Sequence, residues 1–69
     1  EPLAEPLTAR ELEILALISQ RLSDKEIART LSLAMGTVHR HSANIYAKLG
    51  VSRRWDAVAK AQALGLLPR

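Results

Sequence analysis

The feature that most constrains this chain is a helix-start signal that occurs twice. Thr8 and Glu11 have the spacing of a capping box, in which the Thr8 hydroxyl accepts from the Glu11 amide and the Glu11 carboxylate accepts from the Thr8 amide. Ser23 and Glu26 repeat the spacing fifteen residues later. An apolar residue precedes each cap and another follows inside the helix, as in a hydrophobic staple. The two signals predict helices that begin at residues 9 and 24.

Apolar residues then recur at helical spacing along the whole chain. In the third helical segment Val38, Ser42, Ile45 and Leu49 fall on one face. Ala34 stands where that segment should be capped, and its side chain has no oxygen. No run of four or more residues alternates as a strand would. The sequence predicts an all-α, compact four-helix bundle with helices over about 9–20, 24–31, 35–49 and 54–64.

The length of 69 residues allows one small domain, which we place at residues 8–67. Residues 1–7 contain two prolines and have the composition of an interdomain linker remnant. The first residue is Glu1 and not Met, so we expect a piece of a longer protein. The longest apolar run, residues 14–18, is too short to span a membrane, and the chain has no cysteine for a disulfide.

Charge divides unevenly between the two halves of the chain. Residues 1–34 carry six acids and four bases, whereas residues 35–69 carry six bases and one acid. No acidic residue occurs between Gly36 and Arg54. A basic segment on a small domain favours an anionic partner, most often nucleic acid, although a solvated surface face would have the same composition.

Sequence features that would indicate an enzyme are weak. His39 and His41 form an H-x-H pair, but residues two apart on a helix point about 200° from each other, so they cannot chelate one ion. No glycine-rich phosphate loop is present. We therefore predict neither catalysis, nor a metal site, nor a cofactor.

The second and third helices, with a turn over 32–36 that contains Gly36, are typical of a helix-turn-helix. The second helix of such a unit lies in the major groove. On its outward face Arg40 can donate twice to guanine and His39 can donate or accept at a base edge. The small residues Gly36, Ala43 and Ala47 would allow a close approach. On the flanks, Thr37, Asn44 and Lys48 suit phosphate contacts, although Lys48 could equally complement the helix dipole.

The last helix has an uncharged outer stripe. At 100° per residue, Arg54, Ala57, Val58, Ala61 and Leu64 face inward, and the opposite face takes Trp55, Ala59, Gln62, Ala63 and Leu66. Such a stripe predicts a two-fold dimer contact. The alternative is that Trp55 folds back over the bundle.

Several segments together resemble the LuxR/GerE (NarL/FixJ) type of helix-turn-helix domain. The similarity runs without a gap over residues 7–67. It is carried by Leu7-Thr-Ala-Arg-Glu-Leu-Glu-Ile-Leu15, Leu22-Ser-Asp-Lys-Glu-Ile-Ala28, Gly36-Thr-Val-His-Arg-His41, Asn44-Ile-Tyr-Ala-Lys-Leu-Gly-Val51 and Arg54-Trp-Asp-Ala-Val58.

The resemblance implies the C-terminal DNA-binding domain of a bacterial transcription regulator, with the helix-turn-helix at 24–43. It implies double-stranded DNA with near-palindromic half-sites as partner, a weak homodimer through the last helix, contact with RNA polymerase, and a cytoplasmic, nucleoid-associated location. The implied base contacts are His39, Arg40 and Ala43, and the implied DNA backbone contacts are Lys25, Thr37, Asn44 and Lys48.

Three positions depart from the family pattern. Ala34 replaces the usual Ser or Thr cap, His39 replaces the usual Lys, and Trp55 replaces a small polar residue. The segments Leu3-Ala-Glu-Pro-Leu7, Asn44-Ile-Tyr46 and Leu64-Gly-Leu-Leu67 are similar to the MalT-like branch, whose members are large proteins with an ATP-binding regulatory part.

The alternative to DNA binding is a helical protein-interaction module whose basic face meets an acidic protein. Salt distinguishes the two, because binding that neutralises phosphates weakens steeply as salt rises.

Overall fold

The computed structural model describes residues 5–68, so residues 1–4 of the predicted linker lie outside the described residues. Its helices confirm the predicted all-α bundle, and no strand occurs within residues 5–68. Each predicted helix is present, and its bounds differ from the prediction by at most one residue. The helices are α1 Ala9–Ser19, α2 Asp24–Leu31, α3 Met35–Leu49 and α4 Arg54–Ala63.

Both predicted capping boxes are present. The Glu11 amide donates to Thr8 Oγ1 at 3.1 Å, and the Thr8 amide donates to Glu11 Oε1 at 2.9 Å. At α2 the Glu26 amide donates to Ser23 Oγ at 3.1 Å, and the Ser23 amide donates to Glu26 Oε1 at 2.8 Å. These reciprocal bonds satisfy amides that have no partner within the helix, which fixes where α1 and α2 begin.

The turn between α2 and α3 differs from the prediction. It spans residues 32–34, and Gly36 is the second residue of α3. The residue in the left-handed conformation is Ser32, with φ 57° and ψ 44°. The Leu33 amide then donates to the Ala28 carbonyl at 2.8 Å and closes the end of α2. The positive φ of the reversal therefore falls on Ser32, and Gly36 lies within the first turn of α3.

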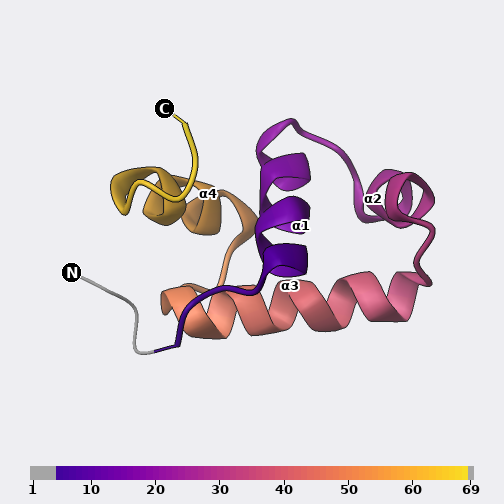
Figure 1. The fold of residues 1–69 in the computed structure, drawn as a ribbon, viewed down its shortest axis with the longest axis horizontal. Coiled ribbons are helices and arrows are strands. Elements are labelled where there is room, and N and C mark those ends of the chain that lie inside the picture. The colour runs from indigo at the N-terminus through magenta and orange to yellow at the C-terminus, as the bar shows by residue number, and fades with distance from the viewer. Residues whose placement is uncertain (1–4, 69) are drawn as a thin grey trace.

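Helix α1 forms the centre of the bundle. It crosses α3 and lies between α2 and α4, which pack against α1 and α3 but not against each other (Figure 1). Ile14, Leu15 and Ile18 of α1 are fully buried. The other helices contribute Ile27, Val38, Ile45, Ala57 and Ala61 to the same core. This arrangement leaves the outer side of α3 uncovered.

Candidate nucleic-acid interface

The outer face of α3 carries the residues predicted to contact bases. Val38, Ser42, Ile45 and Leu49 are buried, as the periodicity predicted. The opposite positions are all exposed, and they are Gly36, His39, Arg40, Ala43 and Ala47. One continuous face of α3 therefore presents two side chains that can bond to base edges, set among residues with little or no side chain.

An acidic residue from another helix lies beside this face. Asp24, the first residue of α2, places Oδ2 3.0 Å from His39 Nε2. The His39 side chain remains 59% exposed despite this contact. Residues 36–54 lack acids in the sequence, but the fold brings Asp24 next to them. Nothing in the local pattern around Asp24 indicated this contact.

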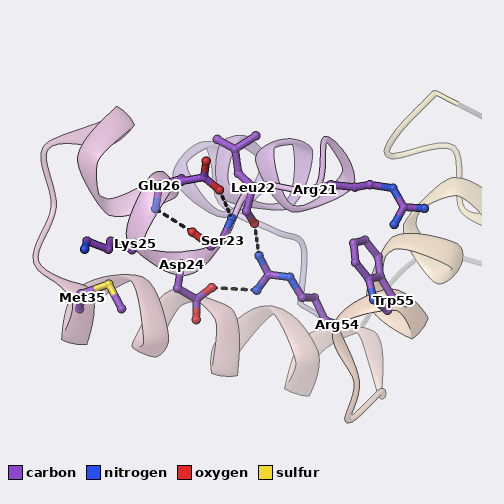
Figure 2. A pocket seen from close by; sticks show the side chains of 9 residues that line it. All are labelled: Arg21, Leu22, Ser23, Asp24, Lys25, Glu26, Met35, Arg54 and Trp55. Atoms are coloured by element: carbon purple, nitrogen blue, oxygen red, sulfur yellow. Dashed lines mark hydrogen bonds and ion pairs between the residues drawn. The ribbon is translucent and has the colours of Figure 1, made fainter.

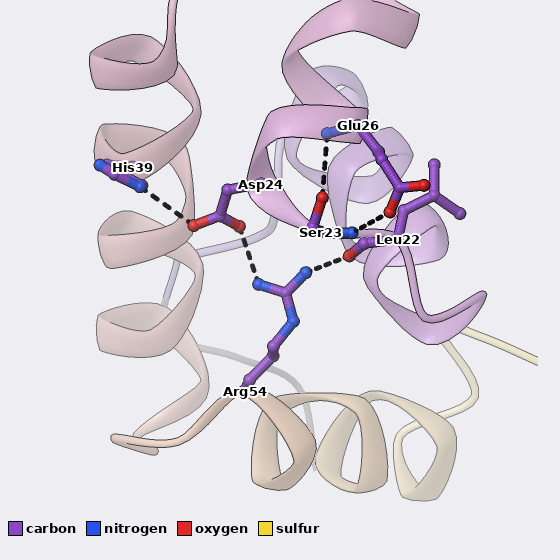
Figure 3. Close-up of polar contacts among 6 residues, drawn as sticks. All are labelled: Leu22, Ser23, Asp24, Glu26, His39 and Arg54. Carbon is purple, nitrogen blue, oxygen red and sulfur yellow. Dashed lines mark hydrogen bonds and ion pairs between the residues drawn. The ribbon is translucent and has the colours of Figure 1, made fainter.

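Asp24 is also held from the other side by Arg54. Nη1 of Arg54 donates to Asp24 Oδ1 at 2.8 Å, and Nη2 donates to the Leu22 carbonyl. Figure 3 shows the Asp24 carboxylate between His39 of α3 and Arg54 of α4. Arg54 thus joins α4 to the start of α2, two helices whose backbones do not pack together. This agrees with its predicted inward position on the last helix.

Lys48, predicted to contact the DNA backbone, lies in an internal ion pair. Its Nζ donates to Glu11 Oε1 at 2.8 Å and to the Pro6 carbonyl at 3.3 Å. The side chain of Lys48 is 16% exposed and that of Glu11 is 4% exposed. Burial raises the pKa of Glu11, but the hydrogen bond and charge of Lys48 together with the Thr8 amide outweigh it, so the pKa is lowered overall. Lys48 therefore neutralises the buried Glu11 carboxylate, and a phosphate would have to compete with Glu11 for it.

The other predicted backbone contacts lie nearer to solvent. Lys25 and Asn44 are exposed, and Thr37 is half-buried in the first turn of α3. Lys25 follows Asp24 at the start of α2, on the same side as the first turn of α3, and Figure 2 shows it next to Met35. Lys25 and Thr37 lie near the start of the exposed α3 face, and Asn44 lies further along the helix.

A shallow groove runs from this region towards α4 (Figure 2). At the far end the Arg21 guanidinium carbon lies 5.0 Å from the centre of the Trp55 ring. Trp55 is 48% exposed, so about half of its surface is covered while the rest faces solvent. The groove is lined by Arg21, Leu22, Ser23, Asp24, Lys25, Glu26, Met35, Arg54 and Trp55.

The predicted stripe on α4 is mostly open to solvent. Ala59 and Ala63 are exposed, as is Leu66 just beyond the helix. Gln62 is half-buried, and its Nε2 donates to the Pro68 carbonyl at 3.3 Å. The sequence did not indicate Arg21, which brings one positive charge to the edge of this stripe.

Within the described part of the chain, no three His, Cys, Asp or Glu side chains lie close enough together to hold a metal ion. Over the same residues, no helix has the length and apolar character needed to cross a membrane.

Comparison with known proteins gives a consistent result. The family model described as bacterial regulatory proteins, luxR family, matches residues 5–61. The crystal structure of the response regulator ChrA, from a heme-sensing two-component system, superposes with a TM-score of 0.89 at 39% identity. It covers 97% of this chain, which in turn spans 33% of that protein. The structure of the transcription factor GerE superposes with a TM-score of 0.83 at 41% identity, over 88% of this chain and 91% of GerE. The bundle, its exposed third helix and these matches together show that the chain belongs to the luxR family of bacterial regulatory proteins.

Proposed function

We propose that this domain binds double-stranded DNA in a sequence-dependent manner, with α3 in the major groove, as the DNA-binding part of a transcription regulator. The observation that carries the proposal is the exposed α3 face, where His39 and Arg40 stand among Gly36, Ala43 and Ala47. The major groove is about 12 Å wide and admits a helix whose contacting side has small side chains. Membership of a family of DNA-binding regulators supports the same role.

Each predicted contact has a chemical role in this proposal. The Arg40 guanidinium can donate two hydrogen bonds to O6 and N7 of guanine. Ala43 offers a methyl group to a thymine methyl or simply leaves room for the base pair. Lys25, Thr37 and Asn44 would bond to phosphates on either side of the groove. Lys48 would contribute less than these, because Glu11 already occupies its ammonium group.

We further infer a two-fold dimer on DNA through α4. The exposed stripe of Trp55, Ala59, Ala63 and Leu66 supports this. A symmetric pair would set two recognition helices about one turn of DNA apart, so operators would be near-palindromic. The stripe is small, and we expect the isolated domain to be mostly monomeric and to pair on DNA.

The test is fluorescence anisotropy with a labelled random-sequence duplex across a series of salt concentrations. DNA binding predicts a log–log slope of about −0.9 for each phosphate neutralised. The exposed Lys25 should contribute to that slope, so Lys25→Ala should reduce it by about one. Arg10→Ala is the matched control, because it removes a cation from α1, outside the proposed interface. A slope near zero would favour the protein-interaction module with a basic face.

Base readout is tested separately, on a duplex selected for tight binding from a randomised library. Arg40→Ala should cost about 1–3 kcal/mol on the selected duplex and relax the preference at one base pair. Lys25→Ala should weaken selected and random DNA alike. If Arg40→Ala also weakened both equally, Arg40 would not read a base.

A further inference from the structure

Asp24 lies in contact with both Arg54 and His39. Oδ1 of Asp24 accepts from Arg54 Nη1 at 2.8 Å, and Oδ2 lies 3.0 Å from His39 Nε2 (Figure 3). Arg54 can only donate, and it is itself fixed by the Leu22 carbonyl. The carboxylate is thereby oriented, with its second oxygen directed at the histidine.

A carboxylate has no hydrogen to donate, so at 3.0 Å it favours the ring form in which the facing Nε2 carries the hydrogen. Neutral imidazole has a single N–H, and the partner of one ring nitrogen decides which nitrogen bears it. With the hydrogen on Nε2, the Nδ1 atom of His39 presents a lone pair. None of the side-chain hydrogen bonds found within residues 5–68 involves that Nδ1.

We propose that Asp24 is a specificity-determining residue that makes His39 Nδ1 an acceptor on the DNA-facing side of α3. An acceptor there selects a base that offers an amino hydrogen in the major groove, namely adenine N6 or cytosine N4. It disfavours guanine and thymine, which would present O6 or O4 to the same lone pair. The proposal rests on the proposed function, because it requires His39 to meet a base edge.

Asp24→Asn is the informative variant because it keeps the shape of the side chain. The Asn oxygen would accept from Arg54 and its NH2 would face His39 Nε2. Nε2 must then accept, so the hydrogen moves to Nδ1 and the expected base preference reverses. Glu13→Gln is the matched control, since it removes one acidic charge from α1, where Glu13 pairs with Arg10 and not with His39.

The experiment selects bound molecules from a duplex library with a randomised segment at pH 8, followed by sequencing. His39→Ala should remove the preference at one position of the enriched motif. At that position the unmodified protein should favour adenine or cytosine about threefold or more, as expected for one hydrogen bond. Asp24→Asn should favour guanine or thymine there, and Glu13→Gln should match the parent.

Failure of this inference is distinguishable from failure of DNA readout. If no motif is enriched at all, the proposed function itself is wrong. If a motif is enriched but His39→Ala changes no position, or Asp24→Asn selects the same base as the parent, the role of Asp24 is overturned. Two-bond ¹H–¹⁵N spectra of the free, unmodified protein at pH 8 test the mechanism without any variant. They should show the hydrogen of His39 on Nε2, and a hydrogen on Nδ1 would refute the proposal.

Discussion

Nζ of Lys48 lies 2.8 Å from Oε1 of Glu11 and joins the last turn of α3 to the first turn of α1. The same Oε1 also accepts from the Thr8 amide, so one carboxylate oxygen serves both the capping box and the ion pair. The start of α1 and the packing of α1 on α3 therefore depend on each other.

Removing the lysine charge should destabilise the domain markedly. Lys48→Met keeps most of the side-chain volume but leaves the buried Glu11 carboxylate without its partner, which costs about 3 kcal/mol. Urea denaturation followed by circular dichroism measures the loss. Lys60→Met, an exposed cation in the last turn of α4, is the control and should change stability little. Glu11→Gln combined with Lys48→Met should recover part of the loss, because Gln can still complete the capping box.

The free energy of unfolding should fall in acid because the Glu11 carboxylate becomes protonated. The pKa of Glu11 is lowered in the folded state from its ordinary value of 4.5. The stabilisation that the charged carboxylate gives to the folded state is therefore complete above pH 4.5, and it is lost as pH falls through the lower folded value. Hydrogen bonds from Ser23 lower the pKa of the exposed Glu26 in the same direction. Urea midpoints at pH 7 and pH 3 should therefore differ less for Glu11→Gln than for the parent. Equal losses in both proteins would contradict this assignment.

The positions of the helices were predictable because the signals that set them are local. A capping box spans four residues, and the apolar periodicity of α3 lies within one helix, so both can be recognised in the sequence. The turn was predicted less well, because Gly36 was placed within it, whereas Gly36 is helical and Ser32 adopts the positive φ. Which residue adopts that conformation depends on how α2 must end against α3.

The candidate site also contains some features that the local sequence predicts and others that it does not. The exposed face with His39 and Arg40 followed from helical spacing alone. The contact of Asp24 with His39 did not, because it depends on how α2 is oriented against α3. Lys48 and Glu11 are 37 residues apart. The sequence already explained Lys48 as a phosphate contact or a helix-dipole residue, and Glu11 as a capping residue. Their pairing arises only from the crossing of α1 over α3.

The missing cap of α3 offers a stabilising substitution. Ala34 has φ −71° and ψ 151°, close to the −74° and 165° of the capping residue Thr8, but makes no side-chain cap bond. The backbone is already in the capping conformation, so Ala34→Ser should add about 1 kcal/mol to the free energy of unfolding. The urea midpoint should rise with an unchanged m-value. Ala34→Val, which adds atoms but brings no acceptor to the Thr37 amide, is the control. Destabilisation by Ser would mean that the hydroxyl cannot reach this amide.

Thr8 and Ser23 provide the converse test. Thr8→Ala and Ser23→Ala each remove an acceptor from a helix-start amide at 3.1 Å, and each should lower stability by about 1 kcal/mol. The urea midpoint should fall with the m-value unchanged. Ser52→Ala, at an exposed position between α3 and α4, is the control. Losses no larger than those of the control would show that the boxes do not set the helix starts.

The last prediction concerns the proposed pairing through α4. Trp55 is half exposed with Arg21 against its ring, and Ala59 lies one turn further along the same helix. Trp55→Ala removes the largest apolar group of the stripe, and Ala59→Glu puts two like charges close to the two-fold axis. Both should abolish cooperative binding to a duplex with two half-sites, as followed by gel shift.

The same variants should bind a single half-site with nearly parental affinity, because neither residue lies on the α3 face. Arg21→Ala is a milder variant that tests the same contact as Trp55→Ala. It removes a contact of the kind that contributes about 0.5–1 kcal/mol at exposed sites, and it leaves the ring in place. It should therefore reduce cooperativity less than Trp55→Ala does. If Trp55→Ala and Ala59→Glu bound the two-site duplex as cooperatively as the parent, the dimer contact would have to lie on another surface. If they also lost single-site binding, the stripe would instead be acting through the fold of α4, and the urea midpoint of each variant would reveal that loss.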